Sequence, residues 1–109
     1  MSLTIPPPVA RYFDAERTDA TDLLASIFAA DAVVRDEGRA IQGLDAIRVW
    51  KRETKAKYQY SVEPIRVSQA ASTLTVLARL TGAFPGSPVD LTYTFALAGD
   101  KIASLEIRP

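Results

Sequence analysis

The stretch AVVRDEGRAIQGLDAIRVW, residues 32–50, decides the fold that this sequence predicts. Residues 33–34 are two valines, which favour a strand. The Asp-Glu-Gly of residues 36–38 favours a turn in which the glycine can take a positive φ. Residues 39–41 can run back as a short second strand. After Gly43, Asp45 lies in the first turn of a helix, where a carboxylate complements the helix dipole. The stretch therefore predicts a strand, a turn with two acids, and a helix that returns over the strand.

Two helices are expected before this stretch. Prolines at residues 6–8 are tolerated in the first turn of a helix, which should end near residues 17–18. Residue 18 or 19 can cap a second helix that runs to about residue 28, and its apolar face consists of Leu23, Leu24, Ile27 and Phe28. Two short helices cannot bury both apolar faces alone, so they are expected to pack on a later part of the chain.

After this stretch the pattern changes from helix to strand. The third helix is expected over residues 44–56, and apolar residues then alternate with polar ones over residues 58–67, 73–83, 89–97 and 102–108. Pro64 interrupts the first of these strands and predicts a bulge or an edge. The order of elements, α-α-β-α-β-β-β-β, predicts an α+β fold with an antiparallel sheet and helices on one face. A chain of 109 residues suits a single domain over residues 1–109.

The composition excludes several classes of function. Thirteen basic and thirteen acidic residues cancel, which argues against a nucleic-acid partner. The sequence has no cysteine and no histidine, which excludes disulfides, histidine metal sites and Ser-His-Asp triads. It also has no Gly-rich phosphate loop, so no metal or cofactor is expected. The N-terminus does not resemble a signal peptide, and no apolar run approaches the ~20 residues that span a membrane. We therefore expect a cytoplasmic location and no membrane contact.

One stretch is biased in charge. The polar side of the third predicted helix carries five basic residues, which are Arg48, Lys51, Arg52, Lys55 and Lys57. A basic helix face can meet an acidic ligand or nucleic acid. Solvated helix surfaces have the same composition, and we interpret these five residues as a solvated surface.

Two residues are candidates for acid–base chemistry. Tyr12 lies on the first predicted helix, where its hydroxyl can donate to a developing oxyanion or simply lie at the edge of the core. Asp36 follows the first strand, where its carboxylate can act as a general base or only shape the turn. Because side chains alternate along a strand, only one of Asp36 and Glu37 is expected to point inward.

The large aromatic side chains are candidates for a pocket lining. Core residues have the same spacing, so core and pocket interpretations both stay open for Phe28, Trp50, Tyr58, Tyr60, Tyr93 and Phe95. On the other face of the sheet, Leu77 among threonines gives a moderately apolar surface, which predicts a homodimer formed through the sheet. Arg79 and Glu106 are expected on that outer face, in a dimer contact, or in an ion pair such as Arg79 with Glu106 or Asp90.

Five motifs occur in order along the chain. They are Ala-Arg-Tyr-Phe at residues 10–13, FAADAVV at residues 28–34, Asp-Glu-Gly at residues 36–38, GLDAI at residues 43–47, and Trp50. Together they resemble the nuclear-transport-factor-two-like superfamily, and most of all its SnoaL-like and ketosteroid isomerase-like branch. The resemblance covers nearly the whole chain. It implies a cone-shaped, curved antiparallel sheet wrapped around three N-terminal helices, a mostly apolar pocket inside the cone, and dimerisation through the sheet.

The resemblance also implies roles for particular residues. Ketosteroid isomerases use a tyrosine on the first helix as oxyanion donor, an aspartate after the first strand as base, and a second, protonated aspartate on a later strand. Tyr12 and Asp36 fall on the first two of these positions, and the third holds Leu91 or Thr92.

Two functions are consistent with these observations. The first is a domain that binds a small hydrophobic molecule and acts as an isomerase or cyclase. In it, Asp36 transfers a proton alpha to a carbonyl and Tyr12 steadies the enolate. The alternative is a non-catalytic, dimeric ligand-binding or interaction module with the same pocket. The two are distinguished by whether the Tyr12 hydroxyl and the Asp36 carboxylate converge on one cavity.

Overall fold

The computed structural model describes residues 5–18, 23–70 and 73–109 of the chain. In chain order the elements are α1 (Pro7–Thr18), α2 (Leu24–Ile27), β1 (Phe28–Asp36), β2 (Arg39–Gln42), α3 (Leu44–Tyr58), β3 (Tyr60–Ala70), β4 (Thr73–Gly82), β5 (Val89–Ala98) and β6 (Lys101–Arg108). The α+β class and the predicted order of elements are confirmed, and the short return arm after the acidic turn is strand β2.

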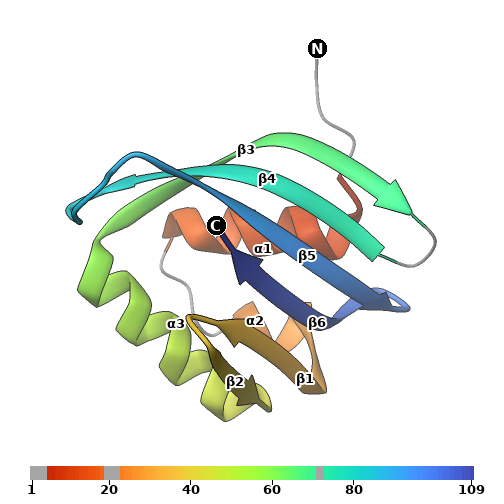
Figure 1. Cartoon of the computed structure of the whole chain (residues 1–109). Coiled ribbons are helices and arrows are strands. Elements are labelled where there is room, and N and C mark those ends of the chain that lie inside the picture. Colours follow the sequence, from red (N-terminus) through yellow and green to blue (C-terminus); the bar gives the residue numbers. More distant parts are fainter. Residues whose placement is uncertain (1–4, 19–22, 71–72) are drawn as a thin grey trace.

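The six strands form one curved sheet in the order β2-β1-β6-β5-β4-β3. The sheet curves around α1, and α3 packs beside its β1–β2 end (Figure 1). Neighbouring strands pair antiparallel, except that β1 and β6 run parallel, with Val34 opposite Leu105. We expected an antiparallel sheet, and this expectation is wrong for one pair of strands, β1 and β6, which is parallel. These two strands are far apart in the sequence, so no tight hairpin forces them to run in opposite directions.

The second helix is shorter than predicted. Phe28 begins β1 instead of ending α2, because its backbone pairs with Ile102 of β6. Leu23, which we expected on the apolar face, is exposed. The caps expected at residues 18 and 19, and the turn expected at residues 70–72, lie wholly or partly outside the described part of the chain.

The core lies between α1 and the concave face of the sheet. Alternate residues of β4 are buried as the pattern predicts, and these are Leu74, Val76, Ala78 and Leu80. The ring of Tyr12 lies 5.6 Å from that of Phe95, and the ring of Phe13 lies 5.6 Å from that of Tyr93. Each such ring, fully buried, stabilises the fold by about 1.5–3 kcal/mol. These contacts fix α1 against β5.

Two local features shape the β3 edge of the sheet. The register of β3 against β4 shifts after Pro64, which confirms the predicted bulge. At the other end of this pair, a Cβ on Gly82 would lie 2.7 Å from the Cα of Tyr60. Only glycine therefore lets β4 approach the start of β3 so closely. None of the helices in the described ranges is both long and apolar enough to cross a membrane.

Candidate functional site

A cavity of about 260 Å³ opens between α3, the end of β1 and the loop that joins β4 to β5. Most of its wall is apolar or aromatic. It is lined by Asp36, Glu37, Trp50, Thr54, Tyr58, Tyr60, Leu80, Phe84, Pro85, Gly86, Val89, Leu91, Tyr93 and Ile107. Four of the six aromatic residues singled out from the sequence are in this lining, namely Trp50, Tyr58, Tyr60 and Tyr93.

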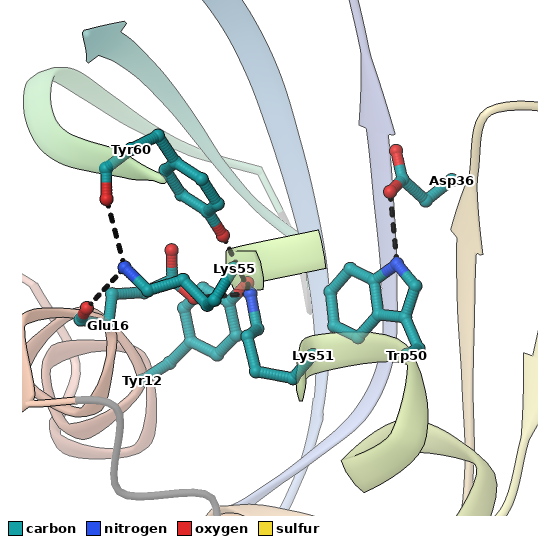
Figure 2. Close-up of polar contacts among 7 residues, drawn as sticks. All are labelled: Tyr12, Glu16, Asp36, Trp50, Lys51, Lys55 and Tyr60. Atoms are coloured by element: carbon teal, nitrogen blue, oxygen red, sulfur yellow. Dashed lines mark hydrogen bonds and ion pairs between the residues drawn. The ribbon is translucent and has the colours of Figure 1, made fainter. Parts of the chain in front are cut away.

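Asp36 is the last residue of β1 and lies half-buried in the cavity wall. Its Oδ2 accepts a hydrogen bond of 3.0 Å from the indole Nε1 of Trp50, which lies on α3 (Figure 2). Burial raises the pKa of Asp36 above its ordinary value, while the Trp50 hydrogen bond opposes the rise and the neighbouring Glu37 adds to it. This carboxyl group is therefore desolvated, held on one oxygen, and open to the cavity on the other side.

Glu37 also lines the cavity, on its open side, where its side chain is exposed whereas that of Asp36 is half-buried. The alternation rule holds for an extended backbone, whereas Glu37 has a φ of 53°, in the left-handed region. This turn conformation brings the second carboxylate to the same side as the first. Glu37 Oε1 accepts a 2.6 Å hydrogen bond from the hydroxyl of Tyr58 at the end of α3.

Phe84 completes the aromatic wall, and the sequence patterns did not single it out. It lies in the loop after β4, and its ring meets the ring of Tyr58 edge-on at 5.8 Å. The only signal for it was an aromatic residue beside the Pro-Gly turn at residues 85–86. Phe28 and Phe95, by contrast, are absent from the cavity lining. Both are fully buried around the ring of Tyr12, so their place is in the core.

Tyr12 is fully buried and is not among the residues that line the cavity. Its hydroxyl accepts a 2.9 Å hydrogen bond from Lys51 Nζ. Burial, and then the charge of Glu16, raise the pKa of Tyr12 well above its ordinary value. The Tyr12 hydroxyl and the Asp36 carboxylate thus do not meet at one cavity. The resemblance implies an oxyanion role for Tyr12, and this role stays a prediction. The Tyr12 hydroxyl does not line the cavity in which a ligand would bind.

Lys51 corrects the interpretation of the third helix as a uniformly solvated basic face. Its side chain is buried, pairs with the buried carboxylate of Glu16, and also donates to the Tyr60 hydroxyl at 3.2 Å. Figure 2 shows Lys51 between the Tyr12 ring and Trp50, on the side of Trp50 away from Asp36. Burial lowers the pKa of Lys51, and Glu16 opposes that change. Helical charge periodicity cannot reveal such a residue, because its partners come from α1 and β3.

Arg79 and Glu106 lie away from the cavity lining. Arg79 is exposed and forms an ion pair of 2.9 Å with Asp90, which is one of the pairs that the sequence left open. Glu106 lies 3.8 Å from Arg108 on its own strand. Within the described ranges no group of three or more His, Cys, Asp or Glu side chains is placed to hold a metal ion.

Comparison with known proteins establishes the family of this chain. The family model of the SnoaL-like domain matches residues 9–105. A Sinorhizobium meliloti protein, provisionally assigned as a polyketide cyclase, is 43% identical over 95% of each chain, with a TM-score of 0.93. No curated protein sequence matches significantly. The chain therefore belongs to the SnoaL-like domain family.

More distant solved structures share the fold. A Catenulispora acidiphila protein with a ketosteroid isomerase-like fold, solved in complex with trimethylamine, is 24% identical, with a TM-score of 0.84 over 97% of this chain and 87% of that one. SalBIII, an epoxide hydrolase/cyclase-like enzyme of pyran ring formation in the polyether salinomycin, is 19% identical. Its TM-score is 0.79 over 93% of this chain and 86% of that one. The nuclear-transport-factor-two-like fold is thereby confirmed.

Proposed function

We propose that this domain binds a small, largely apolar carbonyl compound in the cavity and that Asp36 moves a proton alpha to the carbonyl. The observation that carries the proposal is the state of Asp36, which is half-buried in an aromatic wall with a raised pKa. A general base works best when its pKa lies close to the working pH, and burial moves a carboxyl group in that direction. The bond from Trp50 orients the group through Oδ2 and leaves Oδ1 for the substrate.

Tyr93 is better placed than Tyr12 to donate to the enolate oxygen. It lines the cavity, and its side chain is 1% exposed. Burial raises the pKa of Tyr93 well above its ordinary value, so the hydroxyl keeps its proton and can donate it. Tyr12 then has an indirect role, because its hydroxyl accepts a hydrogen bond from Lys51 and helps to hold that side chain in place.

In the proposed step, Asp36 transfers the proton and Tyr93 stabilises the negative charge that forms. The Asp36 carboxylate takes a proton from the carbon next to the carbonyl, and the electron pair of that C–H bond moves to the carbonyl oxygen. Tyr93 donates a hydrogen bond to the oxyanion that forms. Asp36 then returns the proton to the same carbon or to a conjugated one, which gives exchange or isomerisation. The Sinorhizobium meliloti relative is provisionally assigned as a polyketide cyclase, and SalBIII is described as an epoxide hydrolase/cyclase-like enzyme, which supports an enzymatic role for this domain.

The test is proton exchange in deuterated water, followed by NMR on small cyclic ketones such as cyclohexanone and 2-tetralone. The wild-type protein should speed exchange of the alpha protons, and Asp36→Asn should reduce that rate by about 10²–10⁴-fold. Asp45→Asn, which changes an exposed acid in the first turn of α3, is the matched control and should keep the rate. An Asp36→Asn protein with the wild-type rate would overturn the role of Asp36.

A non-catalytic binding module is the second candidate, and two observations favour it. The Tyr12 hydroxyl and the Asp36 carboxylate do not meet at one cavity, which removes the catalytic pair that the sequence predicted. Leu91, at one of the two positions that the resemblance gives to a second acid, is an apolar part of the cavity wall. A domain of this kind would bind the same ketones without exchange. Binding of 2-tetralone by the wild-type protein, without any exchange above the rate in buffer, would favour it over the enzyme.

A homodimer through the outer face of the sheet is a further part of the proposal. Leu77 lies half-exposed on that face, because its neighbours Val76 and Ala78 point into the core. A half-exposed leucine on β4, the strand next to the β3 edge of the sheet, suits a contact between two copies. Sedimentation velocity should show a dimer for the wild-type protein and a monomer for Leu77→Asp. A wild-type monomer at micromolar concentration would refute the dimer.

A further inference from the structure

The cavity is lined by charges of one sign. Asp36 and Glu37 contribute two carboxylates, and no lysine or arginine is among its lining residues. The hydrogen bonds to these carboxylates come from neutral groups, the indole of Trp50 and the hydroxyl of Tyr58. Neutral donors stabilise a carboxylate without cancelling its charge. The wall of the cavity therefore has a negative potential that favours a cation over a neutral or anionic molecule of the same shape.

Aromatic rings make up much of the remaining wall. Five of the fourteen lining residues are aromatic, and these are Trp50, Tyr58, Tyr60, Phe84 and Tyr93. The faces of such rings attract organic ammonium groups, most strongly where water is excluded. The chain already uses this attraction, since Lys51 Nζ lies 4.3 Å from the ring centroid of Trp50 and Lys57 Nζ lies 5.0 Å from that of Tyr58. Neither lysine lines the cavity.

We propose that the cavity takes a small organic ammonium compound, with its cationic group between the Glu37 carboxylate and the aromatic faces. This inference rests on the proposed function, because it names the substrate class of the same site as an amine-bearing carbonyl compound. Glu37 is exposed and belongs to the open side of the cavity, where it meets the ammonium group. Asp36 and Tyr93 are more buried and are left for the alpha carbon and the carbonyl oxygen.

The basic side chains near the cavity do not take the place of the ammonium group of a ligand. Lys51 is engaged by Glu16 and by the hydroxyls of Tyr12 and Tyr60. Arg39 is exposed, is outside the cavity lining, and only weakly favours the ionised form of Asp36. Lys57 interacts electrostatically with Glu37, but it is exposed and lies outside the cavity lining. The lining thus has two carboxylates and no cation, and a ligand with a positive charge supplies the missing one.

The inference also predicts a dependence on pH. The charged and titratable groups that act on Asp36, or on which it acts, are Glu37, Arg39, Lys51, Tyr12, Tyr60 and Tyr93. Burial raises the pKa of Asp36, and a bound cation favours its ionised form. Affinity for a cation should therefore fall as the pH is lowered through the raised pKa of Asp36, while affinity for a neutral molecule of the same shape should not.

The experiment compares choline with its neutral isostere 3,3-dimethyl-1-butanol, which replaces the charged nitrogen by carbon. Binding is followed by NMR through the indole N–H resonance of Trp50, which is the only tryptophan and donates directly to Asp36. Choline should bind at least about tenfold more tightly than the neutral alcohol. Glu37→Gln should remove most of that ratio, and Glu53→Gln, an exposed acid of α3 outside the cavity lining, should leave it unchanged.

Each outcome decides the inference. A tenfold preference that Glu37→Gln abolishes supports it. Equal binding of the two compounds, or a preference that Glu37→Gln leaves intact, overturns it, and so does binding of neither compound. The proposed function is tested separately by the exchange of ketone protons, so exchange without a preference for choline would keep the enzyme and discard the cationic substrate.

Discussion

Two groups of charged side chains, one buried in the core and one at the cavity, lie on opposite sides of Trp50, and they are satisfied in different ways. In the core, Glu16 and Lys51 pair with each other, and tyrosine hydroxyls complete the shell (Figure 2). At the cavity, Asp36 and Glu37 are like charges side by side, and they receive hydrogen bonds only from neutral donors among the described residues. The first group is balanced without a ligand, and the second is not. A charge that the fold leaves unbalanced next to a cavity is the better indication of function.

The largest effect should come from unbalancing the core group. Lys51→Met leaves the Glu16 carboxylate buried without its cation, which should lower the free energy of unfolding by about 3–5 kcal/mol in urea denaturation. Lys57→Met, on the exposed side of the same helix, is the control and should be nearly neutral.

The double variant Glu16→Gln with Lys51→Met sharpens this test. It removes both charges, so most of the lost stability should return. It also keeps the experiment informative if the single variant does not fold. A Lys51→Met protein as stable as Lys57→Met would show that the core pair is not the balanced unit described above.

A smaller effect is expected from changing Trp50, which lies between the charged pair of the core and the carboxylates of the cavity. Trp50→Phe removes the indole donor to Asp36, which should raise the pKa of Asp36 further and lower the free energy of unfolding by about 1–2 kcal/mol. The pKa is measured by carbon-13 NMR titration of the carboxyl groups. Stability is measured by circular dichroism. An unchanged or lower pKa of Asp36 would contradict its orientation by Trp50.

At the cavity, removing a charge should stabilise the protein. The pKa of Asp36 is raised in the folded state, so its contribution to stability is complete below the unfolded value of about 3.9 and is lost as the pH rises through the folded value. The Asp36→Asn variant has no carboxyl group at this position, so its free energy of unfolding does not fall in this way as the pH rises. At neutral pH it should be more stable than the wild-type protein by under about 1 kcal/mol, a small figure because the carboxyl group is partly solvated.

Urea denaturation across the pH range checks the sign. The difference between Asp36→Asn and the wild-type protein should vanish in acid and grow as the pH rises. If Asp36→Asn is less stable at neutral pH, Asp36 belongs with the balanced charges of the core.

The smallest effect is expected on the outer face of the sheet. Arg79 and Asp90 form an exposed ion pair, which water and salt screen on all sides. Arg79→Met should leave the unfolding transition unchanged within error in dilute protein. A loss of stability that grows with protein concentration would instead place Arg79 in a contact between copies.

Much of the fold could be predicted from the sequence, because it follows from local rules. The alternation of β4, the helix after Gly43 and the bulge at Pro64 each depend on a few consecutive residues, and all three are present. The parallel pairing of β1 with β6 could not be predicted in this way. It joins Phe28 to Ile102, and no periodicity relates residues so far apart.

The candidate site was predictable in part for the same reason. Asp36 lies at a strand end because the Asp-Glu-Gly turn follows it, and Trp50 lies on the inward face of its helix. Strand alternation does not govern Glu37, which follows the end of β1 and has a positive φ. It also could not tell that Tyr12 is sealed in the core whereas Tyr93 meets the cavity, since both are inward-facing tyrosines.

The sequence by itself determined the family, the order of helices and strands, and the acidic turn that ends β1. These depend on residue types and short spacings, which local conformational preferences translate directly into structure. Only the tertiary structure decided which charges are paired. Lys51 meets Glu16 across two elements and is neutralised, whereas Asp36 and Glu37 meet at a turn and stay unbalanced. The energy of a charge depends on its neighbours in space, and those are set by packing rather than by position along the chain.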